Sequence, residues 1–350
     1  MRVSSTVSSL ELAEPLHIAG RTVAEWEVVH VRIEHDGEVG VGEGSPFSRY
    51  GESAASALAY LENAAEVLGT DPWALDETAS RLPAGEFAAR SAIDAALHDL
   101  CGKLAALPVW KLLGLRRAGP PTSWTIGILD PDETARVAER VGGRFRRLKL
   151  KLGGSDGLDL ERVRAVRERV STPLRVDVNE GWDFAEAHDA LPQLARLGVE
   201  LCEQPLPAGA EDAATLKRRS PIPIYVDEDC RVLADVPSCA TIAHGINVKL
   251  AKAGGIREAL RMIHAARSLG LGVMLGCMVE SSLGISAAAQ IASLCDHVDL
   301  DGNLHLRRDP WPGLELVDGV QLPLVAPGLE PNAVEPSSAA RSHREEAPMT

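Results

Sequence analysis

The sequence lacks the features that define several large classes of protein. Its six cysteines form no CxxC pair and have no histidine at zinc-finger spacing, which argues against a disulfide scaffold or a structural zinc site. No apolar run approaches the roughly 18 residues that cross a bilayer, and the N-terminus has no signal-peptide core, so we expect a cytoplasmic protein with no membrane partner. With 36 lysines and arginines against 50 acidic residues, the net charge is -14 and no basic patch is present, which argues against a nucleic-acid partner.

What is present is the composition of a folded protein with two lobes. Hydrophobic residues make up 45% and charged residues 25% of the 350 positions, close to the globular average. In residues 24–43, two runs of alternating character flank Asp36-Gly37, which is a hairpin turn signal. Apolar positions at helical spacing follow at 52–68 and 86–106. We therefore expect an α+β capping domain over residues 1–120.

After Pro120-Pro121, eight short β-rich runs alternate with longer amphipathic ones. This strict alternation favours a closed parallel barrel over residues 121–308; the alternative, a doubly wound open sheet, usually has fewer strands and a glycine-rich nucleotide loop. No eighth helix is indicated, and residues 309–328 are expected to return to the capping domain. Residues 329–350, rich in Pro, Ser, Ala and charge, are predicted to be a disordered tail.

Charged residues stand late in the predicted barrel strands, where apolar residues are the rule. Because the carboxyl ends of parallel strands meet at one mouth of a barrel, we expect these side chains to converge there. The set comprises Lys149, Lys151, Asp177, Glu203, Asp227, Lys249, Asp299 and Asp301. Any one of them could cap a helix or pair with a neighbour, but a buried cluster of charges indicates a metal and a charged substrate.

Three of these charges are carboxylates on consecutive strands, Asp177, Glu203 and Asp227. Carboxylate oxygens with no histidine or cysteine beside them suit Mg²⁺ first and Mn²⁺ second. The histidines show no HExxH-type pairing, which argues against a zinc-dependent barrel hydrolase. A magnesium site at the barrel mouth is therefore predicted.

Six motifs in this order resemble the muconate-lactonizing subgroup of the enolase superfamily. They are KLK at 149–151, DVNEGW at 177–182, EQP at 203–205, VDE at 226–228, NVKLAKAGG at 247–255 and GCMVESSLGISAA at 276–288. The resemblance covers nearly the whole chain and implies a capping domain over a modified (β/α)7β barrel. It also implies that the three carboxylates bind one Mg²⁺ per subunit, that the metal binds the substrate carboxylate, and that Lys151 and Lys249 flank the α-carbon.

The residue types agree with this chemistry. Removing a proton next to a carboxylate creates an enediolate, whose negative charge a divalent cation stabilises. Lys149 shares a strand face with Lys151 and is expected to help that lysine lose its proton, or to contact the substrate carboxylate. Asn179 and Glu228 adjoin the predicted metal ligands and are expected to support them by hydrogen bonds. Asp229 departs from the small residue expected after Asp-Glu, and its role stays open.

The lysine pair permits either 1,1-proton transfer or β-elimination, so other residues must indicate the substrate. Asp299 and Asp301 share a strand face, and this Asp-X-Asp resembles the motif that binds a free α-ammonium in dipeptide epimerases; helix capping is the alternative. Arg21 matches the arginine that reaches the glutamate carboxylate in L-Ala-D/L-Glu epimerases, with an exposed loop arginine as the equal alternative. Thr125 matches a residue next to that carboxylate.

We therefore predict an isomerase: a Mg²⁺-dependent dipeptide epimerase of cell-wall peptide turnover that inverts the second residue of an L-Xaa-L-Xaa dipeptide, with L-Ala-D/L-Glu as the best guess. A homo-oligomer is expected. The alternatives of the same superfamily are an o-succinylbenzoate synthase, an N-acylamino acid racemase or a cycloisomerase. A barrel that only binds a dipeptide is a further alternative, against which the two lysines argue.

Overall fold

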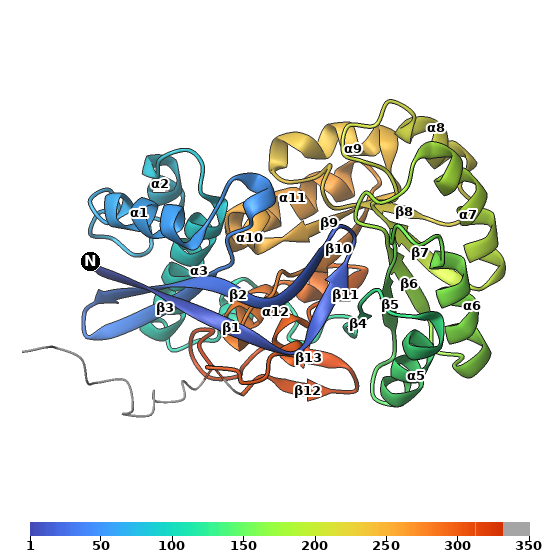
Figure 1. Cartoon of the computed structure of the whole chain (residues 1–350). Coiled ribbons are helices and arrows are strands. Elements are labelled where there is room, and N and C mark those ends of the chain that lie inside the picture. Colours follow the sequence, from blue (N-terminus) through green and yellow to red (C-terminus); the bar gives the residue numbers. More distant parts are fainter. Residues whose placement is uncertain (312, 332–350) are drawn as a thin grey trace, which may run out of the picture.

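The N-terminal part forms an antiparallel sheet covered by helices (Figure 1). The computed structural model describes residues 1–311 and 313–331. Strands β1 (Arg2–Ile18), β2 (Arg21–His35) and β3 (Glu38–Gly44) pair in that order. The helices are α1 (Ala54–Ala64), α2 (Leu75–Arg81), α3 (Phe87–Leu104) and α4 (Val109–Leu112), with the 3-10 helix η1 at Ser48–Tyr50.

The predicted hairpin is confirmed, and a further strand precedes it. Asp36 and Gly37 have φ values of 48° and 82°, the left-handed conformation that an Asp-Gly hairpin turn uses. Strand β1 was not predicted, because its run of serines and threonines is largely exposed and lacks a clear apolar face. It acquires its conformation by pairing with β2 from Arg2 to Ile18, with one register shift between Glu11 and Leu16.

The second part is a parallel sheet that closes into a barrel. Among the described residues it contains eight strands, each paired with the next along the chain. They are β4 (Trp124–Ile126), β5 (Leu148–Lys151), β6 (Leu174–Asp177), β7 (Val199–Glu203), β8 (Ile224–Val226), β9 (Gly245–Lys249), β10 (Gly272–Gly276) and β11 (His297–Asp299). A parallel bridge between Thr122, which precedes β4, and Val298 of β11 joins the two edges of the sheet. This sequential, closed order excludes the doubly wound sheet.

Helices lie between successive strands and cover the outside of the barrel (Figure 1). They are α5 (Pro131–Gly142), α6 (Asp159–Arg169), α7 (Phe184–Arg196), α8 (Ala213–Arg219), α9 (Val236–Ile242), α10 (Leu250–Ala253), α11 (Ile256–Ser268) and α12 (Ser282–Ala289), with the 3-10 helices η2 (Leu233–Asp235) and η3 (Ala292–Leu294). In the described part of the chain, the 3-10 helix η4 (Gly302–His305) follows β11 where an eighth helix would stand. The predicted (β/α)7β barrel with a capping sheet is confirmed.

Strand alternation separates the apolar core from the site. Leu148 and Leu150 of β5 are fully buried in a cluster that includes side chains of α6. Lys149 and Lys151 alternate with them and face the barrel interior, because successive strand residues point to opposite faces. Deeper in the barrel, Tyr225 packs with other apolar side chains. Alternate residues at the end of each strand therefore point into the barrel, where they meet at its open end.

The chain then returns to the capping domain. The hairpin of β12 (Glu315–Val317) and β13 (Val320–Leu322) follows the barrel. The Val109 N–H donates to the Gly328 carbonyl at 3.1 Å, and the Leu329 N–H donates to Asp99 Oδ1 at 2.7 Å. Leu329 is fully buried, so the prediction of a tail from residue 329 is wrong at its start. The predicted tail from residue 332 lies outside the described residues.

None of the helices in the described part of the chain is long and apolar enough to cross a membrane.

Candidate active site

A cavity of about 580 Å³ lies between the barrel mouth and the tip of the β1–β2 hairpin. The hairpin is held over the mouth on two sides: the Ile128 N–H donates to the His17 carbonyl at 2.7 Å, and the Arg307 N–H donates to the Glu11 carbonyl at 2.8 Å. Ten predicted site residues line the cavity: Arg21, Thr125, Lys149, Lys151, Asn179, Asp227, Glu228, Lys249, Asp299 and Asp301. The structure thus brings together residues that are distant in the sequence.

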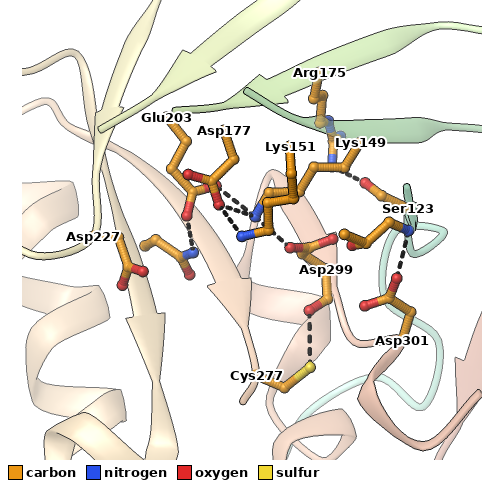
Figure 2. Close-up of polar contacts among 12 residues, drawn as sticks. Ser123, Lys149, Lys151, Arg175, Asp177, Glu203, Asp227, Cys277, Asp299 and Asp301 are labelled. Atoms are coloured by element: carbon orange, nitrogen blue, oxygen red, sulfur yellow. Dashed lines mark hydrogen bonds and ion pairs between the residues drawn. The ribbon is translucent and has the colours of Figure 1, made fainter. Parts of the chain in front are cut away.

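Lys149 lies at the centre of the charged cluster (Figure 2). Its Nζ is 3.0 Å from Asp177 Oδ2, 2.8 Å from Glu203 Oε2 and 2.6 Å from Asp299 Oδ2. Burial lowers the pKa of this lysine, but the three carboxylates outweigh burial and raise it well above its usual value. Lys149 is therefore a charged anchor that joins β5 to β6, β7 and β11.

Lys151 and Lys249 approach the cavity from opposite sides of the barrel. β5 and β9 are four positions apart in the closed eight-stranded order, so they lie across the barrel from each other. Lys151 Nζ is 2.7 Å from Asp177 Oδ2 and 2.9 Å from Asn179 Oδ1. Lys249 Nζ is 2.8 Å from Asp227 Oδ2. Two primary amines thus face one another across the space between them.

The three predicted metal ligands stand at the ends of neighbouring strands, where Asp177 and Glu203 share Lys149 while Asp227 pairs with other lysines. Asp177 pairs with Lys149 and Lys151, whereas Asp227 pairs with Lys249. Burial raises the pKa of both aspartates, but the neighbouring lysines outweigh burial. They lower the pKa of Asp177 to about 2 and also lower that of Asp227. No three acidic, histidine or cysteine side chains converge closely enough to hold a metal in this arrangement of residues 1–311 and 313–331.

The donor set nevertheless fits a hard cation. Glu203 and Glu228 each leave Oε2 buried without a hydrogen bond from any described residue, although Glu203 Oε2 lies close to Lys149. Burial first, and then neighbouring carboxylates, raise the pKa of Glu228 to about 8 and also raise that of Glu203. The site therefore has a surplus of buried carboxylate that a divalent cation would offset.

Lys252 was missed by sequence reasoning, although it lies within the NVKLAKAGG motif. It is 1% exposed, and its Nζ pairs with Asp227 Oδ1. The same Nζ donates to the backbone carbonyls of Asp227 at 2.7 Å, Cys230 at 2.9 Å and Asn247 at 3.1 Å. Its position three residues after Lys249 on a helical turn was the available signal. Lys252 therefore fixes the position of the Asp227 carboxylate from the buried side of the site.

The role of Asp229 becomes clear from the loop after β8. Gln204 Oε1 accepts from the N–H groups of Asp227 at 2.9 Å and Glu228 at 3.0 Å. Gln204 Nε2 donates to Asp229 Oδ2 at 2.7 Å, and the Gly209 N–H donates to Asp229 Oδ1 at 2.8 Å. Asp229 therefore orients the glutamine that fixes the backbone of a predicted metal ligand.

Asn179 and Gln204 have φ values of 45° and 36° at the ends of β6 and β7. Non-glycine residues in this left-handed region are strained, and such strain gathers at functional sites. Asn179 donates its backbone N–H to Asp177 Oδ1 at 3.1 Å, and its Nδ2 donates to Glu228 Oε1 at 3.3 Å. Asn247, which was not predicted, donates its Nδ2 to Glu203 Oε1 at 2.8 Å.

Asp299 and Asp301 both face the cavity but are not equivalent. Asp299 is paired with Lys149, as described above. Asp301 Oδ2 accepts a hydrogen bond from the Thr125 N–H at 2.6 Å. Thr125 thus contacts the Asp-X-Asp motif through its backbone, a role that the sequence did not indicate.

Arg21 is the first residue of β2, not part of an irregular loop. Its guanidinium carbon lies 5.1 Å from the Trp26 ring centre and 4.3 Å from that of Phe47. Stacking on two aromatic rings orients the guanidinium while leaving its edge available for hydrogen bonds. Arg21 therefore forms the cap side of the cavity.

Known proteins are similar to this chain in sequence and in fold. Residues 2–114 match the family described as the mandelate racemase / muconate lactonizing enzyme N-terminal domain, and residues 132–329 match the family described as enolase C-terminal domain-like. An L-Ala-D/L-Glu epimerase from Bacteroides thetaiotaomicron is 39% identical over 297 residues, which cover 83% of this chain and 77% of that protein. A hydrophobic dipeptide epimerase from a Flavobacteria bacterium is 39% identical over 327 residues, which cover 90% of this chain and 93% of that protein.

A solved structure is similar over almost the whole chain. It is a dipeptide epimerase from Enterococcus faecalis V583 complexed with Mg and the dipeptide L-Leu-L-Tyr. The TM-score is 0.90 at 32% identity, and the match covers 94% of this chain and 98% of that one.

Proposed function

The chain belongs to the enolase superfamily, and we propose that it is a Mg²⁺-dependent dipeptide epimerase, an isomerase that inverts the α-carbon of the second residue of an L-Xaa-L-Xaa dipeptide. The observation that carries this proposal is the pair of lysines, Lys151 and Lys249, on opposite sides of one cavity. The cavity also holds two aspartates, Asp299 and Asp301, that suit a free ammonium group.

The reaction assigned to the two lysines is a 1,1-proton transfer. One lysine, as the neutral amine, takes the α-proton from its side of the substrate, and the electron pair of the C–H bond passes into the carboxylate as an enediolate. The opposite lysine, as the ammonium, gives a proton to the other face of the same carbon. Because the two nitrogens lie across the barrel, the configuration inverts. Lys149 lines the same cavity and would either contact the substrate carboxylate or help Lys151 to lose its proton.

Asp177, Glu203 and Asp227 would hold the Mg²⁺, with Asn179 and Glu228 beside them. When bound, the cation would act as a Lewis acid that stabilises the negative charge developing on the substrate carboxylate. Holding a common ligand requires the three carboxylates to turn from their lysine partners, since Asp177 and Asp227 now pair with amines. That exchange would also free the amines for proton transfer.

Arg21 and Thr125 complete the proposed substrate site. Arg21 faces the cavity from the cap and would bind a side-chain carboxylate of the second residue, so L-Ala-L-Glu is the first substrate to test. An acidic dipeptide from cell-wall peptides is the corresponding source.

The test is α-proton exchange in D₂O. The chain is incubated with Mg²⁺ and a library of L-Xaa-L-Xaa dipeptides, and deuterium at the α-carbon is followed by mass spectrometry. We expect one added deuteron at the second residue, and loss of epimerisation in Lys151→Ala and in Lys249→Ala. The exposed Lys111→Ala is the matched control. No exchange in any dipeptide would contradict the proposal, and faster turnover of an N-acylamino acid, a muconate or a succinylbenzoate precursor would favour the other superfamily activities.

A further inference from the structure

The lysines and arginines that line the cavity differ in what compensates their charge. Four of them form ion pairs with carboxylates: Arg49, Lys149, Lys151 and Lys249. Arg21 lines the same cavity, but its guanidinium has no ion pair and no hydrogen bond with any residue in the ranges 1–311 and 313–331. Within these ranges, Arg21 is therefore the cavity cation that is left for an anionic ligand.

The surroundings of Arg21 do not offset the cost of burying its charge. The side chain is partly buried, and burial lowers its pKa. The negative charge of Glu228 raises the pKa but does not cancel the effect of burial, so the pKa of Arg21 stays below its usual value. A carboxylate on the ligand would supply the compensation that these surroundings lack.

Two aromatic rings hold the guanidinium where a carboxylate could have held it. The guanidinium carbon lies 5.1 Å from the ring centre of Trp26 and 4.3 Å from that of Phe47. The face of an aromatic ring attracts a cation but does not cancel its charge. Arg49 provides the contrast, because its Nη2 lies 2.5 Å from Glu180 Oε2 and the protein itself neutralises it.

The cap fixes the positions of the two rings. Trp26 belongs to β2, the strand that begins at Arg21, and Phe47 directly precedes η1. The Trp26 and Phe47 ring centres are 5.6 Å apart, and Phe47 contacts Tyr50 edge to face with centres 5.4 Å apart. Arg231, in the loop after β8, lies over the Tyr50 ring at 4.4 Å. This row of three rings therefore connects Arg21 of the cap to the barrel.

We propose that Trp26 and Phe47 are positioning residues that make the site selective for a dipeptide whose second side chain carries a carboxylate. They hold the Arg21 guanidinium at the cavity by their ring faces and leave its positive charge for the ligand. The inference rests on the proposed function for the dipeptide nature of the ligand. It adds that selectivity depends on how the arginine is held, and not only on its presence.

The test measures calorimetric binding of L-Ala-L-Glu and of L-Ala-L-Gln in Mg²⁺. The two dipeptides have the same shape and differ in the charge of the second side chain. The proteins are wild type, Trp26→Leu, Phe47→Leu, Trp26→Phe, Arg21→Gln and the double variant Arg21→Gln/Trp26→Leu. Trp73→Leu is the matched control, because Trp73 is 50% exposed and does not line this cavity. Both affinities come from one preparation, so a loss of folded protein cancels in their ratio.

We expect wild type to prefer L-Ala-L-Glu by about tenfold or more, and Arg21→Gln to lose this preference. Trp26→Leu and Phe47→Leu should each reduce the preference by about fivefold to tenfold, while their affinity for L-Ala-L-Gln stays within about twofold of wild type. Trp26→Phe, which keeps an aromatic face, should stay within about threefold of wild type, and Trp73→Leu should match it. In the Arg21→Gln background, Trp26→Leu should change the preference no further.

Three results would overturn the inference. They are a wild type that binds L-Ala-L-Glu no better than L-Ala-L-Gln, leucine variants that keep the wild-type preference, and leucine variants that lose affinity equally for both dipeptides, as a purely structural role would require. If the expected pattern is found but no α-proton exchanges in D₂O, the proposed epimerase activity fails and the role of the two rings stands. If α-protons exchange but the leucine variants keep the preference, the activity stands and the role of the rings fails.

Discussion

At the scale of single residues, buried lysines organise the carboxylates of the site. Lys252 is 1% exposed, and its ammonium reaches one side-chain oxygen and three backbone carbonyls. Loss of this ammonium is destabilising, because several buried oxygens lose a donor at once.

The first prediction concerns this lysine. Lys252→Met should lower the free energy of unfolding by about 3 kcal/mol or more, since it removes a buried ammonium donor from Asp227 Oδ1 and from three backbone carbonyls. Urea unfolding followed by circular dichroism measures the change, with the exposed Lys111→Met as the control. A loss below about 1 kcal/mol would show that Lys252 is not a structural anchor.

A second residue-scale prediction concerns pH. Burial and then Glu43 raise the pKa of Glu280 from 4.5 to about 8. Between these values the folded state holds a proton that the unfolded state has released, so stability falls as pH rises through this window. Glu280→Gln should therefore stabilise the protein more at pH 8 than at pH 5, and the two stabilisations should differ by at least about 1 kcal/mol in the free energy of unfolding. Melting temperatures of the variant and of wild type at the two pH values measure this difference. The exposed Glu62→Gln on α1 is the control; an equal effect at both pH values would contradict the prediction.

At the scale of elements, α3 packs directly on the backbone of β3. The glycines of β3 allow this approach: a Cβ at Gly42 would lie 2.1 Å from the Ala92 carbonyl oxygen and 2.6 Å from the Ala96 nitrogen. The helix is correspondingly rich in alanine on that side. This contact helps to position Glu43 and the strand ends of the cap beside the barrel.

Gly42→Ala should therefore displace α3 and cost about 2 kcal/mol or more of stability. Thermal unfolding measures the loss. Gly143→Ala is the matched control, because a Cβ there meets nothing within 4 Å and its φ of -78° suits alanine. Equal melting temperatures for the two variants would mean that the helix can shift without cost.

At the scale of the whole molecule, the acidic chain concentrates several carboxylates at the interface between cap and barrel. The surplus at Glu203 and Glu228 is expected to destabilise the protein until a cation is present. A cation that binds only the folded state would then stabilise cap and barrel together.

Mg²⁺ should therefore raise the melting temperature above its value in EDTA. When free Mg²⁺ is 100-fold above its Kd, the gain in the free energy of unfolding should be about 2.7 kcal/mol. Asp177→Asn should abolish most of that difference. Differential scanning calorimetry of both proteins in EDTA and in Mg²⁺ measures it. Identical transitions for wild type in the two buffers would argue against a site formed by Asp177, Glu203 and Asp227.

The sequence alone determined the barrel and the convergence of its charges. Alternation along a strand and the common direction of parallel strands are local rules, so Lys149, Lys151, Asp177 and Lys249 could be assigned to one mouth before any coordinates. The six motifs extended that assignment to a family.

Tertiary structure alone decided which charges are paired. That Lys149 pairs with Asp299 as well as with its neighbours on β6 and β7, and that Lys252 pairs with Asp227, depends on side-chain reach and burial. The strand β1 likewise exists because β2 lies beside it, not because of its own apolar pattern. Spacing along the chain specifies the strand face on which a residue stands, but only packing specifies its partner, because partners lie many residues apart and their charges are set by what surrounds them.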